Sequence, residues 1–353
     1  MDKRVEKLRK YMKKIDIDAM LISSFANIYY YSNFSSEDGL LLITMKDCYL
    51  ITDSRYTVQA KQESPLYTIE IIDRSYSETL NDLIEIKKID KIGFEESLPY
   101  YRYNAFKEKL NIDMIGLNIE SLKIIKDDIE IEKIRKACEI ADKCYKHILK
   151  YIKVGMKEID VRNEMLRYML SLGASKESFD IIVASGKRGA MPHGIASDKR
   201  IKKGDFVTLD FGCINDYYCS DITRTFVMGD PNEKMKEIYD IVLEAQLKGI
   251  DIIRPGIKAK DVDFACRDFI DKMGYGEYFT HSTGHGLGIL VHDSLSISPK
   301  SETVLKEGMV FTVEPGIYVE GIGGVRIEDD VVVTKDGCEI LTKSSKKLYK
   351  IKS

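Results

Sequence analysis

The segment Thr208-Leu-Asp-Phe-Gly212 is followed by Ser220-Asp-Ile-Thr-Arg-Thr-Phe226, with the turn-prone pair Asn215-Asp216 between them. If this pair forms the loop of a hairpin, Asp210 and Asp221 lie directly opposite each other, with Cβ atoms roughly 5 Å apart. Two facing carboxylates repel each other and resist ionisation unless something positive lies between them. A metal ion would meet that need, and two solvated aspartates on an exposed hairpin are the alternative.

Length, composition and charge limit the class of protein. With 353 residues the chain exceeds a comfortable single core, so we expect two domains. A hydrophobic content of 44% and a charged content of 31% are typical of a soluble globular protein. The formal net charge of −3 gives no general case for a nucleic-acid partner. No apolar run is long enough to span a membrane.

The cysteines point to a reducing compartment. There are seven of them, an odd number, and they are scattered without CxxC pairs. We therefore expect free thiols rather than a disulfide framework or a zinc knuckle. Residues 1–10 are too charged for a secretory signal, so the sequence predicts a cytoplasmic protein.

The chain changes character near residue 123. Residues 1–122 alternate short apolar strands with amphipathic helical patterns and contain no histidine, which predicts a mixed α/β domain without its own chemistry. A long helical pattern then runs from Asp128 to about Lys150, and its acidic start complements the helix dipole. We expect the domain boundary just before it, so that residues 123–353 form the second domain.

A faint internal repeat runs through the second domain. Ile152–Val161 aligns with Ile253–Val262 at an offset of 101 residues. In both copies a glycine, a polar pair and Asp-Val introduce a helix, which Gly173 or Gly274 closes. Chance similarity is the alternative. A true repeat predicts two pseudo-symmetric α/β halves with a site at the seam between them.

Four of the five histidines are candidates for chemistry. His281, His285 and His292 lie within twelve residues of each other, a clustering that scattered structural histidines would seldom show. Glycines on both sides of His285 favour closely approached, extended backbone. His193 follows a proline in a separate segment, whereas a fifth histidine, His147, is simplest as a surface residue of a helix.

Two glutamates interrupt apolar, β-branched runs. Glu314 ends Val310-Phe-Thr-Val, and Glu328 precedes Asp-Asp-Val-Val-Val. An ionised glutamate is seldom buried without a partner, so exposure on an edge strand is the alternative. With Asp210, Asp221 and His285, these residues form a carboxylate-rich set that suits Mn²⁺, Co²⁺, Fe²⁺ or Zn²⁺ better than a structural zinc site. Two ions roughly 3.5–4 Å apart would lower the pKa of a bridging water and clamp a developing oxyanion.

The same motifs carry a family resemblance. From about residue 124 to 340 the chain resembles the creatinase/methionine-aminopeptidase ("pita-bread") metallopeptidase family, M24, and its two-domain layout resembles the proline-specific branch of Xaa-Pro aminopeptidases and Xaa-Pro dipeptidases (prolidases). The segments that match, in the family's order, are Met191-Pro-His-Gly194, Leu209-Asp-Phe-Gly212, Ser220–Phe226, His281–Gly288, Val313-Glu-Pro-Gly316 and Val325-Arg-Ile-Glu-Asp-Asp330.

The resemblance implies a role for each residue. Asp210 would bind one metal ion, Asp221 and Glu328 would bridge two, and His285 and Glu314 would complete the shell of the other. Glu314 would also handle the proton of the attacking water. The resemblance further assigns substrate contact to His193 and His292 and supporting positions to His281 and Arg326.

The resemblance also implies substrates and partners. The expected substrates are short peptides with proline at the second position, cleaved before that proline with two divalent ions, most simply Mn²⁺. The N-terminal domain would restrict cleavage to chain ends and assist a homodimer. Readings left open are a metal-free relative that hydrolyses C–N bonds as creatinase does, an inactive relative that binds a partner, and a methionine aminopeptidase. One stretch departs from the family pattern: where His-Glu followed soon by Pro is common, this chain reads His292-Asp293-Ser-Leu295, so that Asp293 stands for Glu and Leu295 for Pro.

Overall fold

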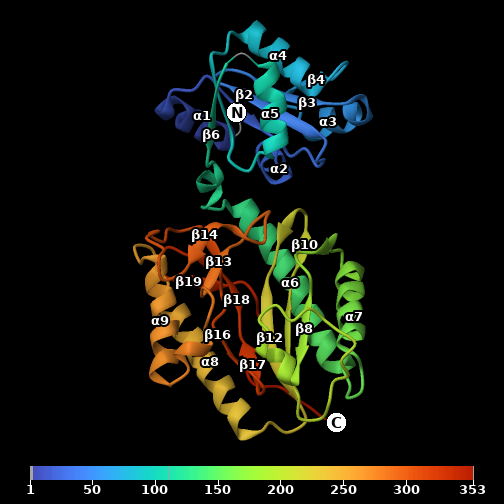
Figure 1. Ribbon diagram of the computed structural model, residues 1–353, viewed down its shortest axis with the longest axis vertical. Helices are drawn as coiled ribbons and strands as arrows, with labels where there is room; N and C mark the ends of the chain where they lie inside the picture. The colour runs from blue at the N-terminus through green and yellow to red at the C-terminus, as the bar shows by residue number, and fades with distance from the viewer. Residues whose placement is uncertain (1–2, 111, 353) are drawn as a thin grey trace. The chain divides into compact units, whose positions relative to one another are not determined.

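The first unit of the chain, Met1–Leu122, is built on one mixed sheet with strand order β4-β3-β2-β1-β5-β6 (Figure 1). The structure is a computed structural model that describes residues 3–110 and 112–352. The strands of this unit are β1 (Ala19–Ile22), β2 (Gly39–Thr44), β3 (Cys48–Thr52), β4 (Thr68–Ile71), β5 (Lys91–Glu95) and β6 (Asp113–Leu117). Its α-helices are α1 (Lys3–Ile15), α2 (Phe25–Ser32), α3 (Thr57–Glu63), α4 (Tyr76–Lys87) and α5 (Tyr100–Lys109).

Hydrophobic spacing explains most of this unit. Helix α1 buries Val5, Leu8 and Met12, which recur at helical spacing along one face. Strands β1 and β2 are buried along their whole length because they lie in the middle of the sheet. The alternation of short strands and helices expected for residues 1–122 is confirmed.

The second unit, Lys123–Ser353, contains two main sheets with helices packed against them (Figure 1). One sheet has the order β20-β12-β9-β8 and the other β14-β13-β15-β18-β19. The strands of these sheets are β8 (Ile182–Ser185), β9 (Phe206–Phe211), β12 (Ile222–Met228), β13 (Gly284–Gly286), β14 (Asp293–Ile297), β15 (Val310–Val313), β18 (Asp329–Val333), β19 (Cys338–Ile340) and β20 (Lys350–Ile351). Smaller pairings involve β7 (Lys176–Glu177), β10 (Cys213–Asn215), β11 (Tyr218–Cys219), β16 (Gly316–Val319) and β17 (Gly323–Arg326).

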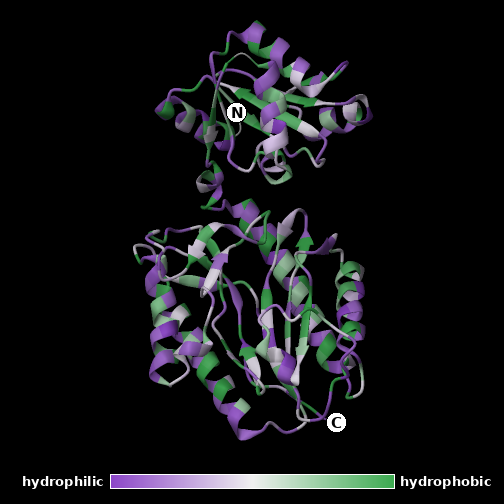
Figure 2. Cartoon of the chain, in the orientation of Figure 1, coloured by the Kyte–Doolittle hydropathy of each residue, from purple (hydrophilic) through white to green (hydrophobic). Residues whose placement is uncertain are grey.

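Four helices cover the sheets in two pairs. The helices are α6 (Asp128–Tyr151), α7 (Glu158–Ser171), α8 (Glu233–Asp251) and α9 (Ala259–Lys272). The core beside β8, β9 and β12 includes residues of α6 and α7, and the core beside β14, β15 and β18 includes residues of α8 and α9. In Figure 2 the strands are mainly hydrophobic and the outer helix faces mainly hydrophilic.

The internal repeat predicted from sequence is confirmed as structural pseudo-symmetry. Gly155 and Gly256, at φ 93° and 92°, precede α7 and α9, and Gly173 and Gly274, at φ 100° and 81°, follow these helices. The positive φ values explain the glycines, because other residues rarely adopt that conformation. Lys157 and Lys258 each donate a backbone N–H to an aspartate three residues later, at 3.3 and 3.2 Å.

The predicted register of the hairpin is wrong by two residues. The loop consists of Asp216 and Tyr217, both at positive φ, rather than Asn215-Asp216, because Asn215 pairs with Tyr218. Asp210 therefore pairs with Thr223 instead of Asp221. A shift of two residues preserves the face on which a side chain lies, so the two aspartates still share one face.

The other sequence expectations can be checked directly. All seven cysteines, each in the described part of the chain, are free thiols. Among the helices of residues 3–110 and 112–352, none combines the length and apolar character needed to cross a membrane. His147 is partly exposed, as expected of a surface residue, and its ring stacks on Tyr168 at 3.9 Å and lies 2.6 Å from Glu164.

Candidate metal centre

A cavity of about 570 Å³ in the second unit gathers the residues that the sequence motifs singled out. All nine line it: Asp210, Asp221, His285, Glu314, Glu328, His193, His292, His281 and Arg326. Further lining residues are Phe179, Asp180, Ile182, Pro192, Ile195, Ser282, Gly284 and Ser296. The cavity therefore receives side chains from both halves of the pseudo-symmetric unit.

Strand ends position the acidic residues. Asp210 lies on β9, and Asp221 immediately precedes β12, the antiparallel neighbour of β9. Glu314 follows β15 directly and Glu328 precedes β18, which pairs with β15. These two strands are interior in the order β14-β13-β15-β18-β19, so the alternative of glutamates on an exposed edge strand is wrong.

Asp221, His285 and Glu328 form the tightest group. One potential ligand atom from each lies within 4.8 Å of the others. His285 Nε2 is 3.5 Å from Asp221 Oδ2 and 3.4 Å from Glu314 Oε1. The backbone of His285 is fixed by its N–H, which donates to Thr312 Oγ1 at 3.1 Å.

Burial and like charge oppose ionisation of these acids. Burial, reinforced by Asp210, raises the pKa of Glu314 to about 8 despite the opposing charge of Arg326. Burial, and then the charge of Glu314, raise the pKa of Glu328 well above its usual range. Burial and the neighbouring Glu328 do the same to the pKa of Asp221. A cation placed among these groups would relieve the repulsion.

The donor set fits divalent metal ions. Asp221 Oδ1 is buried and, within residues 3–110 and 112–352, has no hydrogen-bond partner. A buried acceptor without a partner is unfavourable and calls for a ligand. Burial lowers the pKa of His285, which favours the neutral imidazole that binds metals. Carboxylate oxygens with one imidazole suit the first-row divalent ions.

Arg326 is held by hydrogen bonds on every side. Its guanidinium donates to Asp210 Oδ2 at 2.5 Å, to Tyr318 Oη at 2.6 Å, and to Thr223 Oγ1 at 3.1 Å. Tyr318 Oη also lies 2.9 Å from His281 Nε2. Burial, and then the charge of Arg326, lower the pKa of His281 to about 4, so this imidazole is neutral near pH 7.

His193 and His292 are the more open members of the set. Both are exposed residues that line the cavity. The ring of His292 lies 4.2 Å from that of His285, centroid to centroid. Burial, and then His285, lower the pKa of His292. Imidazole nitrogens that face a cavity can form hydrogen bonds with a bound molecule.

Several supporting residues were not singled out from sequence. Thr223 Oγ1 donates to Glu328 Oε2 at 2.6 Å, and Thr312 Oγ1 donates to Glu314 Oε1 at 3.2 Å. Asp330 Oδ2 accepts the backbone N–H of Asp221 at 2.9 Å. Asp330 carried the same signal as Glu328, an acid in a run of valines, whereas the threonines carried no signal in sequence.

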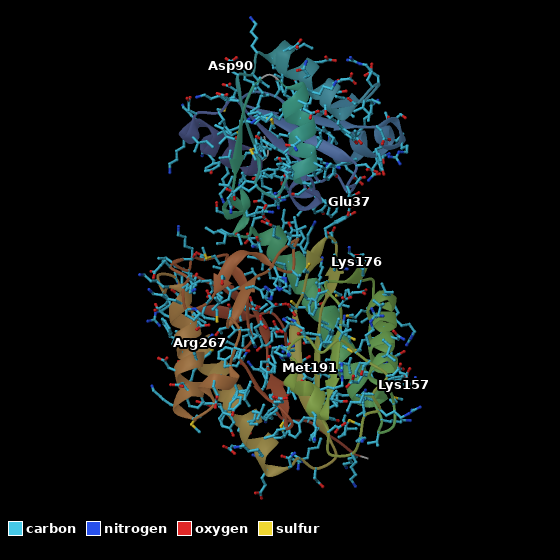
Figure 3. The ribbon with its side chains drawn as sticks, viewed as in Figure 1. Glu37, Asp90, Lys157, Lys176, Met191 and Arg267 are labelled. Carbon is cyan, nitrogen blue, oxygen red and sulfur yellow. The ribbon has the colours of Figure 1, made fainter. Side chains whose placement is uncertain are left out.

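Helix α9 supports the histidine segment. Asp263 Oδ1 accepts both the N–H and the hydroxyl of Thr283, at 3.1 and 2.9 Å. Arg267, labelled in Figure 3, pairs with Asp263 and donates to the carbonyl of His281 at 2.7 Å. The segment between His281 and His285 is therefore tied to α9 through buried charge-assisted bonds.

The arrangement of the fold and the cavity agrees with comparisons to known proteins. Residues 132–335 match the model of metallopeptidase family M24, and residues 4–135 match the creatinase/prolidase N-terminal domain. The chain belongs to metallopeptidase family M24. This family assignment also confirms the two-domain α/β architecture expected from sequence.

Relatives of this M24 chain match it end to end. An Xaa-Pro dipeptidase of Pyrococcus horikoshii is 45% identical over 99% of both chains. The solved structure of an Xaa-Pro dipeptidase from Bacillus anthracis superimposes with a TM-score of 0.97 at 46% identity, covering 98% of this chain and 99% of that one. An X-Pro aminopeptidase from Thermotoga maritima gives 0.91 at 39% identity over 97% and 100%. The M24 chain is thus a metallopeptidase.

Proposed function

We propose that the chain is a two-metal exopeptidase that hydrolyses the bond between an N-terminal residue and a following proline. The observation that carries the proposal is the buried group of Asp221, His285 and Glu328, with Glu314 beside it, inside the cavity. The names of the relatives, which include both Xaa-Pro dipeptidases and an X-Pro aminopeptidase, support the specificity for proline.

We expect each of the five ligand candidates to bind one or both of the metal ions. Asp210 would hold one ion, Asp221 and Glu328 would contribute to both, and His285 and Glu314 would complete the ligands of the second. Mn²⁺ is the proposed metal, with Co²⁺, Zn²⁺ or Fe²⁺ as alternatives, because hard oxygen donors dominate the set. When bound, such ions supply an acidified water and stabilise negative charge on the reacting carbonyl oxygen.

The remaining residues bind the substrate and handle protons. Glu314 accepts the proton released at the attacking water and passes it to the departing proline nitrogen. His193 and His292 donate hydrogen bonds to the bound peptide as its carbonyl becomes tetrahedral. Arg326 fixes the carboxylate of Asp210, and His281 reaches Arg326 through Tyr318.

The wider setting is part of the proposal. The substrates are short peptides with proline in second position, and the first unit restricts cleavage to chain ends and contributes to a homodimer. Seven free thiols suit a reducing compartment, so we place the enzyme in the cytoplasm.

A matched panel of Ala-Pro, Ala-Pro-Ala and Ala-Ala-Ala tests this function. Purified protein loaded with Mn²⁺ should release alanine from at least one proline-containing substrate and leave Ala-Ala-Ala intact. If neither proline-containing peptide is cleaved with any of the four metals, the proposal is refuted. Metal analysis separates the alternatives, because an inactive relative or a metal-free C–N hydrolase would carry no more than trace metal after incubation.

A further inference from the structure

Asp293, the residue after His292, does not line the cavity. Its Oδ2 lies 2.6 Å from Lys126 Nζ, and the two side chains are only 6% and 2% exposed. We propose that Lys126 and Asp293 are a positioning pair that holds His292 at the edge of the cavity. The proposal rests on the proposed function only for the role of His292 in binding the substrate.

His292 depends on its backbone for its position. In the part of the chain described by the structure, its side chain makes no hydrogen bond, and its contact is with the ring of His285. Asp293, the next residue, begins β14, and the pairing of β13 with β14 is irregular between His285 and Gly286. The ladder alone is therefore a weak restraint here, and the side chain of Asp293 supplies a second one.

Lys126 is a rigid anchor for that second restraint. Its backbone N–H donates to the carbonyl of Gly308 at 2.8 Å, just before β15. The following residue, Asp127, caps helix α6 by accepting the N–H of Glu130 at 2.9 Å. The backbone of Lys126 is thus fixed between the start of α6 and the segment that precedes β15. An ion pair to Lys126 therefore restricts the movement of Asp293.

The backbone around the pair leaves room for it. A Cβ atom on Gly288 would lie 3.2 Å from Asp293 Oδ2 and 3.2 Å from Lys126 Cε. These distances are tight, so a larger residue at 288 would press on both members of the pair. Because Gly288 has no side chain, the loop that carries His292 packs closely against the Lys126–Asp293 contact.

Buried ion pairs are weak sources of stability but effective in specifying one geometry. Removing one partner strands the other charge, whereas removing both leaves no unpaired charge. Stability and positioning can therefore be separated. Lys126→Met and Asp293→Asn should each lower the melting temperature, and the double variant should recover most of it. If the pair positions His292, none of the three variants should recover activity.

The experiment compares these variants with wild type on Ala-Pro and Ala-Pro-Ala, with bound metal measured in each. We expect kcat/KM to fall about tenfold to a hundredfold at unchanged metal content, the range for a small misplacement of a contact residue. Asp205→Asn, which breaks the Lys199–Asp205 ion pair of 2.7 Å outside the cavity lining, is the matched control and should retain wild-type kcat/KM.

A mutant cycle with His292→Ala identifies the route of the effect. In the His292→Ala background, Asp293→Asn should cause little additional loss of kcat/KM. A full additional loss would overturn the proposal. Recovery of activity in the Lys126→Met/Asp293→Asn double variant would overturn it as well. Imidazole NMR gives a readout without activity: Asp293→Asn should shift and broaden the His292 signal, and an unmoved signal would also overturn it. If wild type cleaves neither peptide, the proposed function fails while NMR still decides the positioning role.

Discussion

Asp221 places a carboxylate where its environment opposes negative charge. It is 4% exposed, its Oδ1 has no partner in the described chain, and Glu328 and His285 are its close neighbours. A residue in this position contributes little to the stability of the metal-free protein at neutral pH, because its ionised form is unfavourable there. Its value is in binding a cation.

Asp221→Asn is expected to remove most bound metal and at least a hundredfold of kcat/KM, since a ligand charge is lost while the shape is kept. Unfolding should remain cooperative. Asp216→Asn in the turn of the same hairpin is the control, because asparagine also tolerates positive φ. Full metal content with near wild-type turnover in Asp221→Asn would contradict the assignment.

The acids of the centre also set a pH dependence. In the folded, metal-free protein, burial raises the pKa of Glu314 from its ordinary value of 4.5 to about 8. Between these values the folded state binds more protons than the unfolded state, so the free energy of unfolding falls as pH rises, by up to about 1.4 kcal/mol per pH unit for each such proton. Glu328 and Asp221 act in the same direction.

Urea unfolding of the metal-free protein from pH 7 to 8 checks this sign, because below this range the lowered pKa values of His281, His285 and His292 act in the opposite direction. The unfolding free energy should decrease across the range, and Glu314→Gln should flatten the slope because it removes one titrating group. Saturating Mn²⁺ should reverse or abolish the trend, since a cation favours the ionised carboxylates. A metal-free protein that becomes more stable as pH rises would refute the direction.

At the scale of elements, the site depends on how closely strands approach. A Cβ on Gly284, the first residue of β13, would lie 1.9 Å from the carbonyl oxygen of Thr312 on β15. No side chain fits without separating the two strands, and His285 follows directly on the same strand. The glycines around the histidines therefore serve sheet packing rather than a phosphate-binding loop.

Gly284→Ala is expected to destabilise the protein by a few kcal/mol, in the range of overpacking in a core, and to lower metal content by displacing His285. Thermal unfolding and metal analysis check both effects. Gly337→Ala is the matched control, because its Cβ would meet only the carbonyl oxygen of Ile253, at 3.9 Å. A variant Gly284→Ala with unchanged melting temperature and metal content would be inconsistent with this packing.

At the scale of the whole molecule, the cysteines are distributed through the cores. Burial raises the pKa of Cys138, Cys144 and Cys266, and these thiols have no exposed surface. Cys48 and Cys338 are only partly buried. Because the thiolate is the reactive form and must be reached by the reagent, the buried cysteines should be inert in the native state.

An aromatic disulfide reagent should modify at most Cys48 and Cys338 rapidly in the native protein and all seven cysteines after denaturation. Cys48→Ser and Cys338→Ser should each remove one fast-reacting thiol. Rapid modification of more than two thiols under native conditions would show that one of the cores opens far more readily than its packing indicates.

Arg326 was assigned only by the family resemblance, whereas the residues themselves predicted the α/β class, the pseudo-symmetric repeat and the eight other motif residues that line the cavity. These follow from local signals: hydrophobic spacing, glycines that need positive φ, and acids in runs that should be apolar. The register of the hairpin was not predictable, since Asn215-Asp216 and Asp216-Tyr217 are both plausible loops and only the pairing of β9 with β12 selects one. The support by Thr223 and Tyr318 also left no signal in the sequence, whereas Asp330 carried the same signal as Glu328.

By itself, the sequence determined which side chains share one face of a strand, because successive side chains in a strand point to opposite faces. Tertiary structure decided what those residues meet. Asp210 and Asp221 became diagonal neighbours rather than a facing pair, and Glu328 became a buried neighbour of His285. Asp293 turned away from the cavity toward Lys126, 167 residues earlier. Contacts between distant segments depend on the packing of both halves, which no local pattern records.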